Sequence, residues 1–207
     1  KVTEIALSGQ ALAQFDLSGI LAAADLLSHA RCQVIGWSGT AAGWLGFDTD
    51  RRLCEAIERS TGARACTSVL ALNEIFERTG VRRFGLVTPY RDDVQAAIVA
   101  NYARAGFDCA AERHLGLQDN FSFSEVGPEP LRSMVRALLS GPAAQRPEAI
   151  VILCTNLRGA PLVDALEDEF GVPVYDSIAT VVWKSLQLAG VDTRRVTGWG
   201  RLFRDLA

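Results

Sequence analysis

Short apolar segments alternate with amphipathic segments along most of the chain. Three segments rich in β-branched and aliphatic residues are typical of strands buried on both faces; they span Gln33–Trp37, Arg83–Val87 and Ala149–Leu153. Five other segments place apolar residues three or four positions apart, as amphipathic helices do; they span Thr49–Ser60, Ser68–Thr79, Arg91–Ala105, Pro130–Ser140 and Ala160–Phe170. This alternation predicts an α/β fold in which parallel sheets are flanked by helices.

Glycines stand where several of these helices should end. The positions are Gly62, Gly80, Gly106 and Gly171. Glycine adopts the left-handed conformation that closes a helix without steric cost, so each is expected to be a helix C-terminus.

Two stretches of the chain repeat the same order of elements. A strand ending near Gly39-Thr40 and a strand ending at Cys154-Thr155 are each followed by a helix, a glycine, a second strand and a second helix. Duplication predicts two pseudo-symmetric Rossmann-like lobes, the first formed by residues 1–80 and 176–207 and the second by 81–175. Open α/β sheets bind ligands beyond the carboxyl ends of their strands, so we expect an active site in the cleft between the lobes. The alternative is that any two strand–helix units share this order.

Composition narrows the class of protein. Of the 207 residues, 49% are hydrophobic and the formal net charge is −3, with lysines and arginines scattered among acids, so nucleic acid is not an expected partner. No apolar run approaches the roughly 20 residues of a membrane helix, so no membrane partner is expected. The five cysteines show no CxxC spacing, which favours a reducing compartment, and the cytoplasm is the expected location.

Several motifs resemble one known group of enzymes. Residues Cys154–Arg158, the turn Thr88–Tyr90 with Asp92–Val94 after it, and Asn120–Phe123 resemble the maleate cis-trans isomerases of the Asp/Glu racemase superfamily. The ending Gly198–Phe203 resembles the arylmalonate decarboxylases of the same superfamily. Each motif is weak alone, but their combination and order are more specific.

This resemblance implies two lobes that each contribute one cysteine to opposite faces of a substrate carbon, without cofactor. Here the first of these cysteines falls on Gly39 and the second on Cys154. Arylmalonate decarboxylases also have glycine in place of the first cysteine, and there too a threonine follows it. In the family a strand precedes the segment that begins here at Lys1, so the first lobe is expected to lack that strand.

The expected chemistry builds negative charge on a carboxylate and gives an enediolate, which several hydrogen-bond donors must stabilise. The expected substrate-binding residues are Gly39, Thr40, Ala41, Tyr90, Asn120, Thr155 and Asn156. Cys154 is the expected catalytic proton donor. A thiol pKa near 8.5 suits that role, and a position before a helix N-terminus would lower it further.

The sequence leaves three functions open for a small dicarboxylate or substituted malonate. Gly39 favours a decarboxylase, because a single cysteine delivers a proton from one face. Asn120–Phe123 and Cys154–Arg158 favour an isomerase or racemase, and loss of one cysteine could also mark a carboxylate-binding protein without turnover. Each of these three functions is compatible with a homo-oligomer.

No organic cofactor or metal is expected, because no phosphate-binding glycine motif and no ligand cluster is present. His29 stands apart, His114 lacks an evident acidic partner, and Cys66 is expected to be structural.

Overall fold

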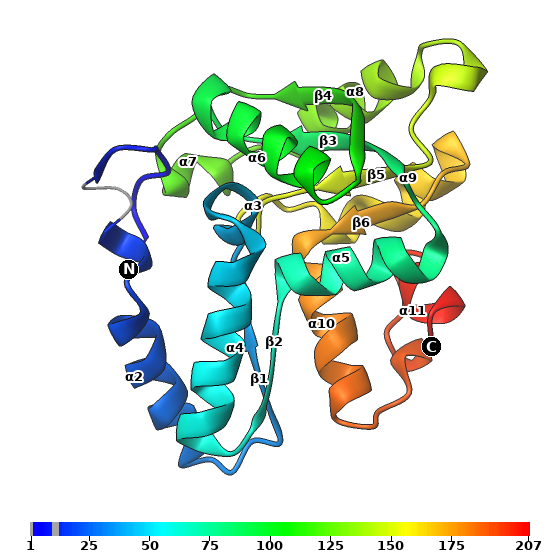
Figure 1. The fold of residues 1–207 in the computed structure, drawn as a ribbon. Coiled ribbons are helices and arrows are strands. Elements are labelled where there is room, and N and C mark those ends of the chain that lie inside the picture. The colour runs from blue at the N-terminus through cyan, green and yellow to red at the C-terminus, as the bar shows by residue number, and fades with distance from the viewer. Residues whose placement is uncertain (1, 10–12) are drawn as a thin grey trace.

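The computed structural model describes residues 2–9 and 13–207 and has two parallel sheets flanked by helices (Figure 1). The smaller sheet pairs β1 (Val34–Trp37) with β2 (Arg64–Thr67). The larger sheet has the order β4 (Asp108–His114), β3 (Arg83–Thr88), β5 (Ala149–Ile152) and β6 (Val174–Asp176). The predicted α/β fold with two lobes is confirmed, as are the three strands predicted from apolar runs.

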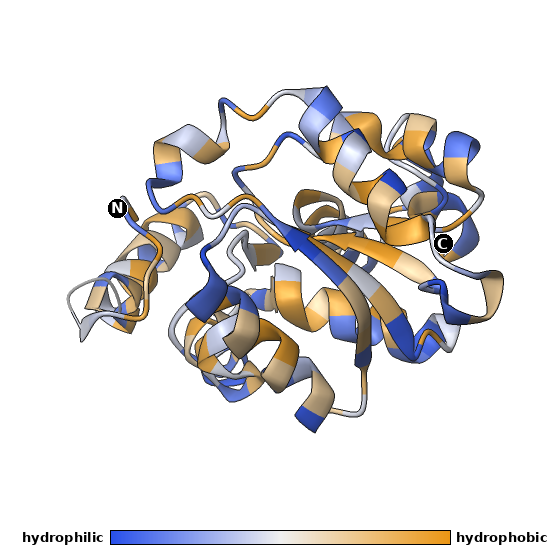
Figure 2. Ribbon diagram, turned by 90° about the horizontal axis from the view of Figure 1, so that it is seen from above, coloured by the Kyte–Doolittle hydropathy of each residue, from blue (hydrophilic) through white to orange (hydrophobic). Residues whose placement is uncertain are grey.

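The helices are amphipathic, and apolar and polar residues alternate along them (Figure 2). In the described part of the chain the α-helices are α2 (Leu17–Ser28), α3 (Ala42–Leu45), α4 (Phe47–Thr61), α5 (Ser68–Thr79), α6 (Asp92–Arg104), α7 (Asn120–Phe123), α8 (Pro128–Leu139), α9 (Val163–Phe170), α10 (Ser177–Leu188) and α11 (Leu202–Asp205). Short 3-10 helices are η1 (Ala13–Phe15), η2 (Ala143–Gln145), η3 (Ala160–Leu162) and η4 (Thr193–Arg195). The predicted helix over residues 160–170 therefore begins as the 3-10 turn η3.

The predicted glycine positions do close helices. Gly62, Gly80 and Gly171 end α4, α5 and α9 with φ values of 72°, 73° and 73°. Gly106 has φ 85° and follows Ala105, the last cap residue of α6. A residue with a side chain would be strained in this left-handed conformation.

Helix α5 follows the smaller sheet in the chain but packs against the larger one. The fully buried Phe76 ring lies 5.2 Å from the ring of Phe84 on β3 and 6.3 Å from that of Tyr175 on β6, measured between centroids. Buried aromatic side chains contribute large apolar areas to a core. These aromatic contacts therefore hold α5, the last helix of the first repeat, against the larger sheet.

Helix α10 makes the reverse connection, from the larger sheet to the smaller one. Gly36 on β1 lets helix α10 approach the smaller sheet closely, because a Cβ at position 36 would lie 3.0 Å from Ser185 Oγ and 3.1 Å from Val181 Cγ2. Ser185 Oγ also lies 3.2 Å from Cys66 Sγ on β2. Cys66 is thus buried under α10, as expected of a structural cysteine.

The larger cluster of buried apolar residues packs around the larger sheet and joins helices from both repeats to it, with members such as Val69 on α5 and Leu86 on β3. A smaller cluster joins α2 and α4 to the smaller sheet; it consists of Ala24, Ile35, Leu53, Ile57 and Ala63. Because the larger core is continuous, the division into residues 1–80 with 176–207 and 81–175 stays a proposal. No helix in the described part of the chain is long and apolar enough to cross a bilayer.

His114, at the end of β4, corrects one expectation, because it has two acidic partners. Its Nδ1 lies 2.8 Å from Glu112 Oε2 and its Nε2 lies 2.8 Å from Asp92 Oδ1. Partial burial lowers the pKa of His114, but the hydrogen bonds and charges of Glu112 and Asp92 outweigh it, so the pKa is raised. Glu112 lies two residues away on the same strand face, whereas Asp92 meets His114 only through the fold.

We expect His114 to stabilise the fold in a pH-dependent way. Since its pKa is raised on folding, the stabilisation is complete below the unfolded value of about 6.5 and is lost as pH rises through the folded value. His114→Gln should therefore reduce the free energy of unfolding in urea more at about pH 5.5 than at about pH 9. His29→Gln removes a histidine outside this network and is the control. Equal losses from His114→Gln at both pH values would contradict the ion-pair role.

Candidate active site

The carboxyl ends of β1, β3 and β5 meet at one cavity of about 190 Å³. The predicted site residues Gly39, Thr40, Ala41, Tyr90, Asn120, Cys154, Thr155 and Asn156 all line this cavity, which is called the site cavity below. The loop after β1 supplies the first three, and the loops after β3 and β5 supply Tyr90 and Cys154. Two repeats of the chain thus contribute to one cavity.

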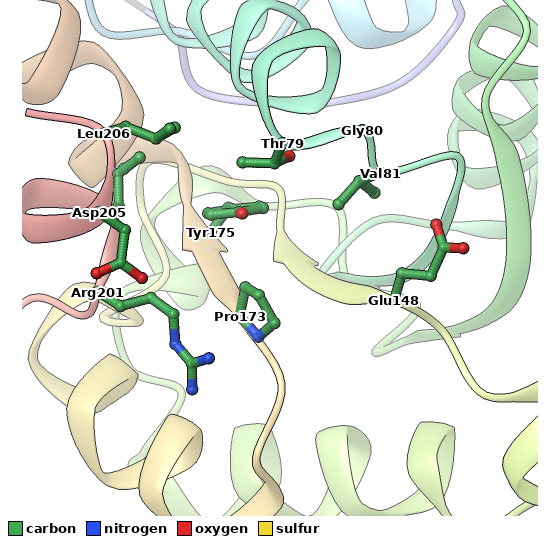
Figure 3. Close-up of a pocket in the computed structure, with 10 residues that line it drawn as sticks. Thr79, Gly80, Val81, Glu148, Pro173, Tyr175, Arg201, Asp205 and Leu206 are labelled. Atoms are coloured by element: carbon green, nitrogen blue, oxygen red, sulfur yellow. The ribbon is translucent and has the colours of Figure 1, made fainter.

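A larger cavity of about 400 Å³ lies elsewhere (Figure 3). Val81, Glu148 and Pro173 line it, and each stands just before β3, β5 or β6. It therefore lies at the amino ends of these strands, whereas open parallel sheets bind ligands at their carboxyl ends. The site cavity is the better candidate despite its smaller volume.

Two hydroxyl groups face each other inside the site cavity. Thr40 Oγ1 lies 2.9 Å from the Tyr90 hydroxyl oxygen, and these residues are 5% and 1% exposed. The Tyr90 ring is held edge-on between Trp44 and Phe123, with centroid distances of 5.2 Å and 5.7 Å. Burial raises the pKa of Tyr90 well above its usual value, so this residue is a neutral phenol that can donate a hydrogen bond.

Cys154 is only 3% exposed, and burial raises the pKa of its thiol to about 11. Hydrogen bonds from the Tyr90 hydroxyl and from the backbone amides of Asn156 and Leu157 lower the pKa, but less than burial raises it. Asp176, whose carboxyl group is close enough to interact, adds a further increase. Cys154 is therefore a neutral thiol near pH 7.

The expected lowering of the Cys154 pKa by a helix N-terminus is wrong. After β5 the chain forms a turn and the 3-10 helix η3, and the α-helix α9 begins only at Val163. Because a helix dipole acts mainly within its first turn, it has little effect at Cys154. Loss of hydration on burial therefore determines the protonation state of the Cys154 thiol.

The asparagines of the site cavity form one of its walls. Asn156 Nδ2 donates to the backbone oxygen of Asn120 over 2.5 Å, and Asn120 Nδ2 donates to the backbone oxygen of Val2 over 3.1 Å. The Asn156 backbone amide points to Cys154 Sγ over 3.4 Å. In this structure both side-chain amides are engaged by the protein, and the segment at Val2 completes the wall.

Sequence reasoning missed several residues that line the site cavity: Val2, Ile5, Phe15, Trp37, Ser38 and Trp44. Trp37 and Ser38 directly precede Gly39, so their place in the same loop was an available signal. Val2 and Ile5 lie before the first regular element, where the sequence shows no periodicity that would place them. Within residues 2–9 and 13–207, no group of three or more His, Cys, Asp or Glu side chains is arranged to bind a metal ion.

Two parallel sheets that meet at a cavity with a cysteine beyond β5 agree with the architecture that the resemblance to the Asp/Glu racemase superfamily implies. The sequence model described as arylmalonate decarboxylase matches residues 7–203, and the chain belongs to that family. This match confirms the superfamily resemblance found in the motifs.

The relatives are enzymes with two different activities. Arylmalonate decarboxylase of Bordetella bronchiseptica is 28% identical over 189 residues, which cover 87% of this chain and 78% of that protein. Maleate isomerase of Nocardia farcinica is 30% identical over 139 residues, which cover 67% of this chain and 54% of that protein. A crystal structure of arylmalonate decarboxylase is 26% identical with a TM-score of 0.80, over 91% of this chain and 82% of that one.

We expect alkylation of Cys154 to report its raised pKa. At about pH 7.5 a thiol with a pKa of about 11 holds roughly one thiolate in a thousand or fewer, so iodoacetamide should label Cys154 slowly. The rate should rise about tenfold per pH unit up to about pH 10. Tyr90→Phe removes a hydrogen bond that lowers the pKa, and should slow labelling further.

Peptide mass spectrometry resolves Cys154 from the other cysteines in this experiment. Tyr175→Phe, which changes a buried tyrosine outside the site cavity, is the matched control. Rapid labelling of Cys154 that does not depend on pH between about 7 and 9 would contradict a neutral thiol.

Proposed function

We propose that this chain is a cofactor-independent decarboxylase of α-substituted malonates in which Cys154 protonates the α-carbon. One observation carries the proposal: a neutral, buried thiol and a pair of hydroxyl donors line one small cavity, with glycine at the position of a second cysteine. The family membership supports it, because a decarboxylase is among the relatives.

The first requirement is a place for the carboxylate that the product keeps. The Thr40 and Tyr90 hydroxyls and the backbone amides of the loop at residues 39–41 are the donors for its two oxygens. A donor aimed at developing negative charge in a water-poor site contributes roughly a hundredfold or more in rate. These groups therefore stabilise the enediolate more than the starting carboxylate.

The second requirement is a place for the carboxylate that leaves. Ile5, Phe15 and Trp44 add apolar surface to the lining of the site cavity. An ion without partners is unfavourable in such surroundings, and it loses its charge when it departs as carbon dioxide. The bond between the α-carbon and this carboxyl group breaks, and its electron pair passes into the retained carboxylate.

Proton transfer completes the reaction. The Cys154 thiol gives its proton to the α-carbon, the enediolate becomes a carboxylate, and the resulting thiolate regains a proton from water. A thiol with a raised pKa remains protonated until the carbanion forms next to it. With Gly39 in place of a second acid, the proton comes from one face.

An isomerase of the maleate type is the second candidate. The 30% identity to a maleate isomerase and the asparagines in the site cavity favour it. By the family resemblance, however, that reaction uses a cysteine nucleophile at the position of Gly39. A racemase likewise needs two acids that exchange roles.

We expect α-aryl or α-alkyl malonates to release carbon dioxide and to gain one deuterium at the α-carbon in deuterium oxide. Proton NMR with a panel of malonates, maleate and amino acids tests this. Cys154→Ser should lose at least roughly a hundredfold in turnover, because a serine hydroxyl is too weak an acid. The variant should still bind malonate in calorimetry.

Cys66→Ser is the matched control, because Cys66 is equally buried but lies outside the site cavity beside Ser185. It should retain turnover. Isomerised maleate without decarboxylation would support the second candidate. Malonate binding without turnover would identify a carboxylate-binding protein, and undiminished turnover by Cys154→Ser would place the proton donor elsewhere.

A further inference from the structure

The indole ring of Trp37 occupies the space into which a side chain at position 39 would project. A Cβ atom on Gly39 would lie 2.6 Å from both Cε2 and Nε1 of Trp37 and 2.8 Å from Cζ2. These distances are shorter than van der Waals contact, so any side chain at position 39 requires the ring to move. Glycine at position 39 and tryptophan at position 37 therefore fit together as a pair.

The Trp37 ring is supported from behind. It packs against the smaller apolar cluster, which includes Ala24, Ile35 and Ile57. Trp37 also lines a second, mostly apolar cavity of about 350 Å³ beside α2, in addition to the site cavity. Trp37 thus borders both cavities, and displacing its ring loses apolar contacts with α2 and α4.

Positions 39 and 154 correspond in the two repeats. Gly39 follows β1, whose parallel partner is β2, and Cys154 follows β5, whose partner β6 holds the equivalent place. Both positions line the site cavity. A second acid could therefore act from position 39, but only in the volume that the indole ring fills.

We propose that Trp37 is a specificity-determining residue: its ring closes the side of the site cavity from which position 39 would reach the substrate, and so leaves Cys154 as the single proton donor. This inference rests on the proposed decarboxylase function. The indole N–H is far too weakly acidic to protonate a carbanion carbon, so the ring blocks that face without acting from it. The lack of an acidic group at position 39 is therefore only part of the reason for one-sided protonation, and the ring of Trp37 is the other part.

A stability cycle tests the contact independently of activity. Gly39→Ala should lower the Tm by roughly 3 to 10 °C, the usual range for forcing atoms into filled space. In the Trp37→Ala background, Gly39→Ala should lower the Tm much less, because the ring that fills this space is absent. An equal loss of Tm in both backgrounds would overturn the proposed contact. Gly141→Ala, at a position with open space, and Trp199→Ala, outside both cavities, are the controls.

Deuterium exchange tests the consequence for specificity. The substrate is an enantiopure α-aryl carboxylate, the product expected from the decarboxylase. Exchange through two opposed groups requires one thiolate to remove the α-proton while a thiol on the other face donates one. The double variant Trp37→Ala/Gly39→Cys should exchange and racemise this acid at least about tenfold faster than Gly39→Cys alone.

Equal exchange by the single and double variants would overturn the role of Trp37, and Gly141→Cys controls for an added thiol elsewhere. A wild-type protein that fails to decarboxylate malonates would refute the proposed function instead. In that case the stability cycle still decides whether Trp37 excludes a side chain at position 39.

Discussion

Helix α5 follows the smaller sheet in the chain but covers the larger one, and α10 follows the larger sheet but covers the smaller one (Figure 1). The site cavity depends on this exchange of helices. Phe76 fixes α5 against the larger sheet, and the close approach at Gly36 fixes α10 against the smaller one. Because apolar packing tolerates little displacement, these contacts fix the position of the two sheets relative to each other. The loops after β1 and β5 consequently contribute to the same cavity, so neither repeat could form the site alone.

Burial then sets the chemistry of that cavity. Removal from water raises the pKa values of both Cys154 and Tyr90, so these groups are uncharged donors near pH 7. The same loss of water strengthens their interaction with negative charge that develops during a reaction. Burial makes Cys154 a poor nucleophile but keeps it protonated. Together with Gly39 under the Trp37 ring, this arrangement suits one-sided proton delivery better than the two-sided exchange of a racemase.

The sequence predicted the parts of the structure that depend on local pattern. Strands such as β5 are continuous apolar runs, and glycines such as Gly62 mark helix ends through backbone conformation. Strand β4 was missed because it lies at a sheet edge, where charged residues such as Glu112 and Arg113 replace the apolar run. The site residues came from motifs, but the ring of Trp37 over Gly39 depends on support from α2 and α4, which no local pattern reveals.

The protonation state of Cys154 is the central claim, and infrared spectroscopy of the S–H stretch measures it directly. The spectrum of the Cys154→Ser variant, subtracted from that of the unmodified chain, isolates the Cys154 band from those of the other cysteines. A neutral, buried thiol with a pKa of about 11 predicts a Cys154 S–H band at neutral pH that persists to about pH 10 and fades above it. Absence of this band at neutral pH would show a thiolate and would contradict a role for Cys154 as the waiting proton donor.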